Sequence, residues 1–182
     1  MKILHILLLL FATSLSVLVK AADSEVATQE ITLNVASTAL LAISGPPVVL
    51  QMNGAAEAGD AVSEAVEDQN TRLRITSLVT GSETRSISAK ISESPIGTRL
   101  LVSLLEPNES FVNRTEMGVL KGEQELGIND VTLIDQIGTC WSGKQDGDGY
   151  VIKYKYEAIE GATVLRGGSI TITYTIFEAS PE

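Results

Sequence analysis

Hydrophobic residues recur at every second position over several stretches of this chain. The pattern is clearest in the last third, where apolar and aromatic residues alternate with Lys over 150–156 and with Thr over 170–176. A period of two is typical of a strand, because successive side chains of a strand point to opposite faces. We therefore predict two strands that form an antiparallel pair. Their inward residues are Tyr150, Ile152, Tyr154 and Tyr156, then Ile170, Ile172, Tyr174 and Ile176.

Shorter stretches upstream show the same alternation or end at turn residues. They predict a half-buried strand at 31–35, an edge strand at 40–50 that is broken by Gly45-Pro46-Pro47, a hairpin over 72–91, and strands near 100–104 and 131–137. The intervening segments 53–70 and 106–127 are predicted mainly as loops. The chain has no strong amphipathic helix. The fold class is therefore predicted as all-β, a single immunoglobulin-like antiparallel β-sandwich of seven or eight strands.

The N-terminus has the pattern of a secretory signal peptide. Lys2 precedes an apolar stretch from Ile3 to Val19, and small residues lie at the −3 and −1 positions of a cleavage site after Ala21. Cleavage one residue later, or an uncleaved anchor, are the alternatives. The predicted organisation is a signal peptide at 1–21, a flexible lead-in at 22–30, the sandwich at 31–178 and a tail at 179–182. We expect a secreted protein, extracellular or at the cell surface, with the periplasm as an alternative, and no membrane insertion once the leader is removed.

Charge and residue usage narrow the function classes. The net charge of the chain is −10, and removing the leader with its two lysines leaves −12. Such an acidic domain is a poor partner for nucleic acid, because phosphate binding needs a basic surface. The single histidine, His5, leaves with the leader, which removes triads that use His and most zinc sites. The single cysteine, Cys140, cannot form an intramolecular disulfide and is predicted to be buried. We expect no catalytic residue, no cofactor and no bound metal.

Three local motifs have both a structural and a functional interpretation. Trp141 lies between two glycines, where it either packs on the core, the interpretation we favour, or stacks on a sugar ring. The run 146–149 begins like a calcium loop, but the strand pattern that follows it favours a tight turn. Asn108 and Asn113 begin Asn-X-Ser/Thr acceptor patterns for glycosylation.

An ordered series of segments carries a resemblance to a known class of protein: 73–77, 95–98, 133–138, 139–143, 150–156 and 170–176. On these segments the chain resembles secreted bacterial β-sandwich proteins of the fimbrial-subunit or surface-adhesin type. It implies a structural or adhesive role. One cysteine cannot supply the intradomain disulfide that chaperone-assembled pilins usually carry. Residues 22–30 are also too polar for the apolar donor strand of such subunits, although 31–35 could serve.

We therefore expect an exported, non-enzymatic structural or adhesive subunit, fimbria- or pilus-like or at the cell surface, that acts through contacts with other protein chains. The predicted strand-pairing edges are Ile31, Leu33 and Val35, and Ile170, Ile172, Tyr174 and Ile176. The alternative is an extracellular module that binds carbohydrate or another small ligand, with Trp141 and the loops 53–70 and 106–127 as its site. A hydrolase with two carboxylates ranks third.

Overall fold

A computed structural model describes residues 29–55, 57–59 and 65–179 of the chain. The chain divides into two units, Met1–Asn34 and Val35–Glu182. The predicted signal peptide at 1–21, most of the lead-in and most of the tail lie outside the described residues. Within the first unit, residues 29–34 belong to no helix or strand and are exposed.

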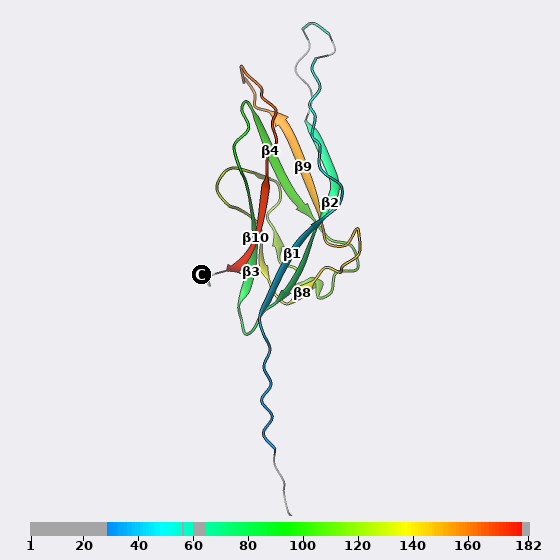
Figure 1. The fold of residues 1–182 in the computed structure, drawn as a ribbon, viewed down its shortest axis with the longest axis vertical. Coiled ribbons are helices and arrows are strands. Elements are labelled where there is room, and N and C mark those ends of the chain that lie inside the picture. The colour runs from blue at the N-terminus through cyan, green and yellow to red at the C-terminus, as the bar shows by residue number, and fades with distance from the viewer. Residues whose placement is uncertain (1–28, 56, 60–64, 180–182) are drawn as a thin grey trace, which may run out of the picture. The chain divides into compact units, whose positions relative to one another are not determined.

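The described part of the second unit consists of ten strands and one turn of 3-10 helix (Figure 1). The elements are β1 (Thr38–Ser44), β2 (Val66–Leu78), β3 (Thr84–Ile91), β4 (Thr98–Leu105), η1 (Arg114–Glu116), β5 (Val119–Leu120), β6 (Gln124–Glu125), β7 (Val131–Ile137), β8 (Cys140–Trp141), β9 (Tyr150–Ala158) and β10 (Ile172–Ala179).

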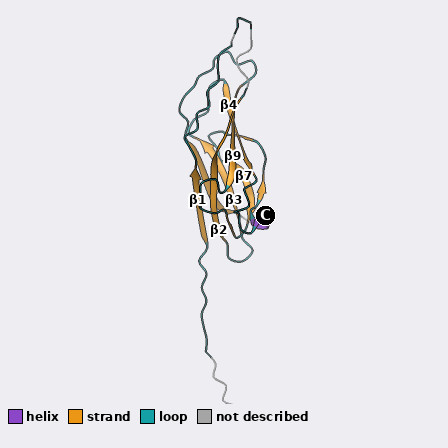
Figure 2. Ribbon diagram, turned by 90° about the vertical axis from the view of Figure 1, so that its right-hand side faces the viewer, coloured by secondary structure: helices purple, strands orange, loops and turns teal. Residues whose placement is uncertain are grey.

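These strands form two antiparallel sheets in a sandwich-like arrangement (Figures 1 and 2). Sheet A has the order β1-β2-β9-β4-β6, and β8 also pairs with β2. Sheet B has the order β10-β3-β7-β5. The predicted all-β sandwich is confirmed, with ten strands in place of seven or eight because β5, β6 and β8 are only two residues long.

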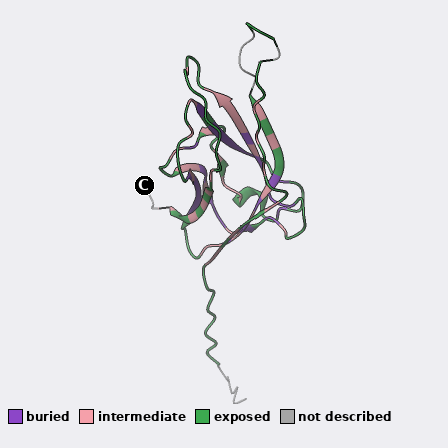
Figure 3. Ribbon diagram, turned by 45° about the horizontal axis from the view of Figure 1, so that its top comes forward, coloured by how far each residue is buried: buried purple, intermediate pink, exposed green. Residues whose placement is uncertain are grey.

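The core follows the alternation that the sequence predicts. Leu73 of β2, Val102 of β4 and Ile152 of β9 are fully buried on the inner face of sheet A, and Ile87 of β3 and Ile134 of β7 are fully buried in sheet B. Burying a side chain of this size contributes about 1.5–3 kcal/mol. Buried residues are concentrated in the strands, while residues 29–37 are exposed throughout (Figure 3).

Two predicted strand pairings are wrong, because the chain crosses between the sheets where a hairpin was expected. β2 lies in sheet A and β3 in sheet B, so the turn at Gly81 joins the two layers. β9 and β10 also lie in different sheets, since β9 pairs with β2 and β4 whereas β10 pairs with β3. Their tyrosines meet across the sandwich, where the hydroxyls of Tyr154 and Tyr174 are 2.9 Å apart.

The predicted edge strand at 40–50 is confirmed in its first part, because β1 is an edge of sheet A and ends before the prolines. Gly45 follows β1 with a φ of 125°, and a Cβ there would lie 2.6 Å from the carbonyl oxygen of Asn70. The predicted loop at 53–70 is wrong at its C-terminal end, since β2 begins at Val66. The segment 106–127 is a loop with η1 and two short strands, β5 and β6.

Candidate functional site

The predicted half-buried strand at 31–35 is wrong, because these residues are extended and exposed but paired with no described strand. The exposed fractions of Ile31, Leu33 and Val35 are 69%, 86% and 66%. β2 ends at Leu78, which pairs with Thr38 of β1, so this ladder offers no partner to residues before Thr38. The alternation that predicted burial therefore leaves three apolar side chains in solvent.

β10 is an edge strand of sheet B. Its eight residues pair with β3 in continuous register, from Ile172 opposite Ile91 to Ala179 opposite Thr84. No other described residue forms a backbone hydrogen bond with this strand, so its second edge is unpaired in the described part of the chain. Ile170, also predicted as part of the strand, precedes its first residue.

The inward side chains of β10 are only partly covered. Ile172, Tyr174 and Ile176 pack against the core but are half-buried, whereas Ile87 and Ala89 of the neighbouring β3 are fully buried. β1, the corresponding edge of sheet A, shows the same gradient, because its inward residues Leu41 and Ile43 are less buried than their partners on β2. The edge marked by β1 and β10 is therefore the incompletely covered side of the sandwich.

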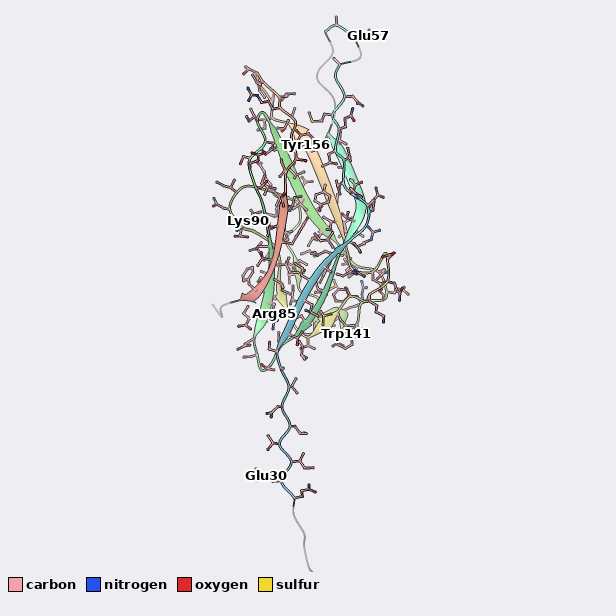
Figure 4. The ribbon with its side chains drawn as sticks, viewed as in Figure 1. Glu30, Glu57, Arg85, Lys90, Trp141 and Tyr156 are labelled. Atoms are coloured by element: carbon pink, nitrogen blue, oxygen red, sulfur yellow. The ribbon has the colours of Figure 1, made fainter. Side chains whose placement is uncertain are left out.

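A groove with a volume of about 660 Å³ lies at one end of the sandwich. Its lining comes from three segments far apart in the sequence, near 48–54, 93–100 and 165–172, and from β9. Leu100, Tyr154, Ile170 and Ile172 contribute apolar surface. Tyr156, which Figure 4 places toward the upper end of β9, accepts a hydrogen bond of 3.0 Å from Thr98 Oγ1. The sequence pattern identified the individual strands but not this groove.

The tyrosine pair beside the groove is uncharged. Burial raises the pKa of Tyr154 above its ordinary value, and burial together with the neighbouring Tyr154 raises that of Tyr174. Both hydroxyls therefore remain protonated at neutral pH and can act as hydrogen-bond donors or acceptors but not as bases. The groove thus offers apolar contact and neutral tyrosine hydroxyls, together with one acidic and one basic residue, Glu93 and Arg166, in its lining.

Cys140 and Trp141 form the two-residue strand β8 and point to opposite sides of sheet A. The predicted burial of Cys140 is confirmed, since its side chain is fully buried, and burial raises the pKa of its thiol to about 12. The favoured burial of Trp141 is wrong, because its exposed fraction is 43%. Adjacent residues of a strand face opposite ways, so a buried Cys140 places Trp141 on the outer face.

The run 146–149 is a turn, as predicted. Gly147 and Gly149 have φ values of 94° and 101°, in the region that favours glycine. Asp148 accepts hydrogen bonds from the backbone N–H of Gln145 (2.8 Å) and from Asn108 Nδ2 (3.2 Å). Hydrogen bonds from Ser110, from the Gln145 backbone and from Asn108 hold the pKa of Asp148 below its ordinary value. The carboxylate therefore ties two loops together.

The two asparagines of the glycosylation patterns hold loops in place through hydrogen bonds. The amide of Asn108 donates to Asp148 and to the Gly147 carbonyl, and that of Asn113 donates to the Thr139 carbonyl (3.0 Å), so both side chains hold loops in place. Among the described residues no group of three or more His, Cys, Asp or Glu side chains is placed to hold a metal ion. The described part of the chain also contains no helix that is long and apolar enough to cross a membrane.

A scan against protein-family models finds no match to this chain, and searches of curated proteins and of solved structures find none either.

Proposed function

We propose that this protein is an exported, non-enzymatic structural or adhesive subunit, and that it associates by strand addition. In this proposal the segment Ile31–Val35 of one copy adds to the unpaired edge of β10 in a second copy. Export rests on the leader pattern of residues 1–21, and the structural role agrees with the resemblance to fimbrial subunits and surface adhesins.

The observation that carries the proposal is the exposure of Ile31, Leu33 and Val35 at alternate positions of an extended segment. Isolated apolar side chains are common on protein surfaces, but three that share one face of an extended chain have the pattern of a strand that lacks its sheet. When an extended segment adds to a sheet edge, main-chain hydrogen bonds supply affinity and alternate side chains supply specificity. Residues 31–35 can supply both, because their backbone groups are unpaired in the described part of the chain and their apolar side chains alternate.

β10 is the matching acceptor. Its second edge is unpaired, and its inward residues Ile172, Tyr174 and Ile176 are only half-buried, so an added strand would cover apolar surface as well as backbone groups. Exposed sheet edges are usually protected by Lys, by Pro or by bulges. β10 has no Lys or Pro, and its register with β3 has no bulge. β1 lies close to β10 without bonding to it, so an added strand would have to fit beside β1. An edge that lacks these protections favours pairing with another chain.

The test is the association state of the protein, expressed from its full coding sequence, over a wide concentration range by light scattering. We expect dimers or longer assemblies that grow with concentration. A variant with Ser at positions 31, 33 and 35 keeps the segment but removes its apolar face, and it should remain monomeric. A wild-type protein that is monomeric at every concentration, or a triple variant that assembles equally well, would overturn the proposal.

A further inference from the structure

A row of side chains crosses the outer face of sheet A at the end opposite the groove. Leu40 of β1 pairs with Thr76 of β2, Thr76 pairs with Trp141 of β8, and Trp141 forms a bridge with Val112. Residues directly opposite each other in antiparallel strands point to the same face. Because Cys140 is buried, this shared face is the outer one, and Leu40, Trp141 and Val112 are all exposed on it. The row is therefore mostly apolar and includes the single tryptophan, which Figure 4 shows near the lower end of the sandwich.

Two arginines adjoin this row on β2. Arg74 and Arg72 lie two and four residues before Thr76, so alternation places them on the same face. Arg74 Nη1 donates to the Lys144 carbonyl (2.6 Å), and Arg72 Nη1 donates to the carbonyls of Gln69 (2.7 Å) and Thr71 (3.0 Å). Among the described residues neither guanidinium has a carboxylate within 4.0 Å.

The lack of a carboxylate partner distinguishes these arginines from the other cations of the same face. Lys153 pairs with Glu67, and Lys155 and Arg99 both pair with Glu157. In a chain of net charge −10, acids are plentiful, yet among the described residues Arg72, Arg74 and Lys144 all lack a carboxylate within 4.0 Å, as does Arg166 beside the groove. The carboxylate of Asp148 is close enough for Arg74 to help lower its pKa, but the two groups form no ion pair.

We propose that the outer face around Arg74, Thr76 and Trp141 binds an anionic sugar polymer, with carboxylate or sulfate groups. The anionic group accepts hydrogen bonds from the Arg74 guanidinium, whose planar fork suits a carboxylate or a sulfate. The apolar face of a neighbouring sugar ring lies against the indole of Trp141, while Thr76 offers a hydroxyl between the two.

The geometry favours a sugar polymer over an acidic peptide. Arg74 is diagonal to Trp141 across the β2–β8 ladder, a Cα separation of about 7–8 Å, which suits one sugar ring and its charged substituent. Peptides usually dock at sheet edges or in grooves, whereas this surface is the flat outer face of a sheet. The site is distinct from Ile31–Val35 and from β10, so it can hold whether or not strand addition occurs.

The test measures the change in fluorescence of the single tryptophan as a polysaccharide is added to the protein. The protein is expressed from its full coding sequence. The probes are polygalacturonate and dextran sulfate, which separate carboxylate from sulfate recognition. Methyl-esterified polygalacturonate and unmodified dextran are their neutral counterparts, and polyglutamate is the acidic peptide. We expect saturable binding of at least one anionic polysaccharide, weaker binding at higher salt, and no binding of the neutral polymers.

Variants locate the site. Arg74→Gln should lower the association constant about tenfold or more, since hydrogen bonds to charged groups contribute about 1.5–3 kcal/mol. Lys90→Gln is the matched control, because it removes one positive charge from sheet B and should change binding less than twofold (Figure 4). Arg74→Lys keeps the charge but not the planar fork, so it should also bind weakly, and circular dichroism checks that each variant is folded.

The proposal is overturned if no anionic polysaccharide binds, if neutral polymers or polyglutamate bind as well as the anionic ones, or if Arg74→Gln and Lys90→Gln behave alike. Calorimetry with Trp141→Phe gives a second measurement should Arg74→Gln fail to fold. That variant keeps an aromatic ring of smaller area, so we expect it to retain binding with reduced affinity, and unchanged affinity would contradict the role of the indole.

Discussion

Replacing Leu33 by Asp perturbs the proposed strand addition without touching the core. Leu33 is 86% exposed, so burying it fully against a second copy would contribute ~1.3–2.6 kcal/mol of the ~1.5–3 kcal/mol available to a Leu side chain. Loss of that contribution lowers the association constant by about 10- to 80-fold, and the desolvation of Asp adds to the loss. The free energy of unfolding of an isolated chain should stay within about 0.5 kcal/mol of wild type, as is usual for exposed positions.

The matched control is Thr32→Asp, which adds the same charge to the same segment on the opposite face of the extended chain. Sedimentation velocity over a concentration series measures the association constants of wild type and both variants. We expect Thr32→Asp to follow wild type within a few-fold and Leu33→Asp to shift strongly to monomer. Equal association constants for the two variants would refute the assignment of a buried and an exposed face to Ile31–Val35.

Three further predictions concern the stability of the fold. Ser142→Ala should lower the free energy of unfolding by about 1–3 kcal/mol in urea titrations, because the buried Ser142 Oγ accepts a hydrogen bond of 2.9 Å from the Ile75 N–H; an unchanged midpoint would contradict that bond. Gly97→Ala and Gly122→Ala both place a side chain at a φ of 74°, but only at Gly97 would the new Cβ overlap a backbone carbonyl oxygen. Calorimetry should therefore find Gly97→Ala less stable than Gly122→Ala by about 1–3 kcal/mol, and equal losses would contradict the close approach. Since the folded pKa of Asp148 is lowered, its contribution to stability is full above the unfolded pKa near 3.9 and is lost as the pH falls through the lower folded pKa. The stability of Asp148→Asn should vary less with pH than that of wild type in this acidic window, and identical profiles would contradict the assignment.

Most of the long strands were predictable from the sequence, and the clearest of them are buried on one face. Tyr150, Ile152 and Tyr154 alternate with Val151 and Lys153, and the structure buries the tyrosine face between the two sheets. Which strands pair with one another was less predictable. A glycine turn such as Gly81 serves equally for a hairpin and for a crossing between sheets, and only contacts far apart in the sequence decide between them.

Local sequence patterns did not predict the main features of the candidate sites. Ile31–Val35 alternates like a buried strand, but alternation records only that one face is apolar, not which chain covers it. Trp141 lies in a strand of two residues, too short to show a period, so its orientation followed only from the burial of Cys140. The unpaired arginines on β2 were not identified either, because the absence of a carboxylate neighbour depends on strand order.

The most direct test of strand addition is hydrogen exchange of individual backbone amides in dilute and concentrated protein. If Ile31–Val35 adds to β10, amides of both segments become protected together as the protein associates: those of 31–35, and those of β10 that do not already bond to β3. Association that leaves both segments exchanging as fast as in the monomer, or that protects another edge such as β6 instead, would contradict the proposed function.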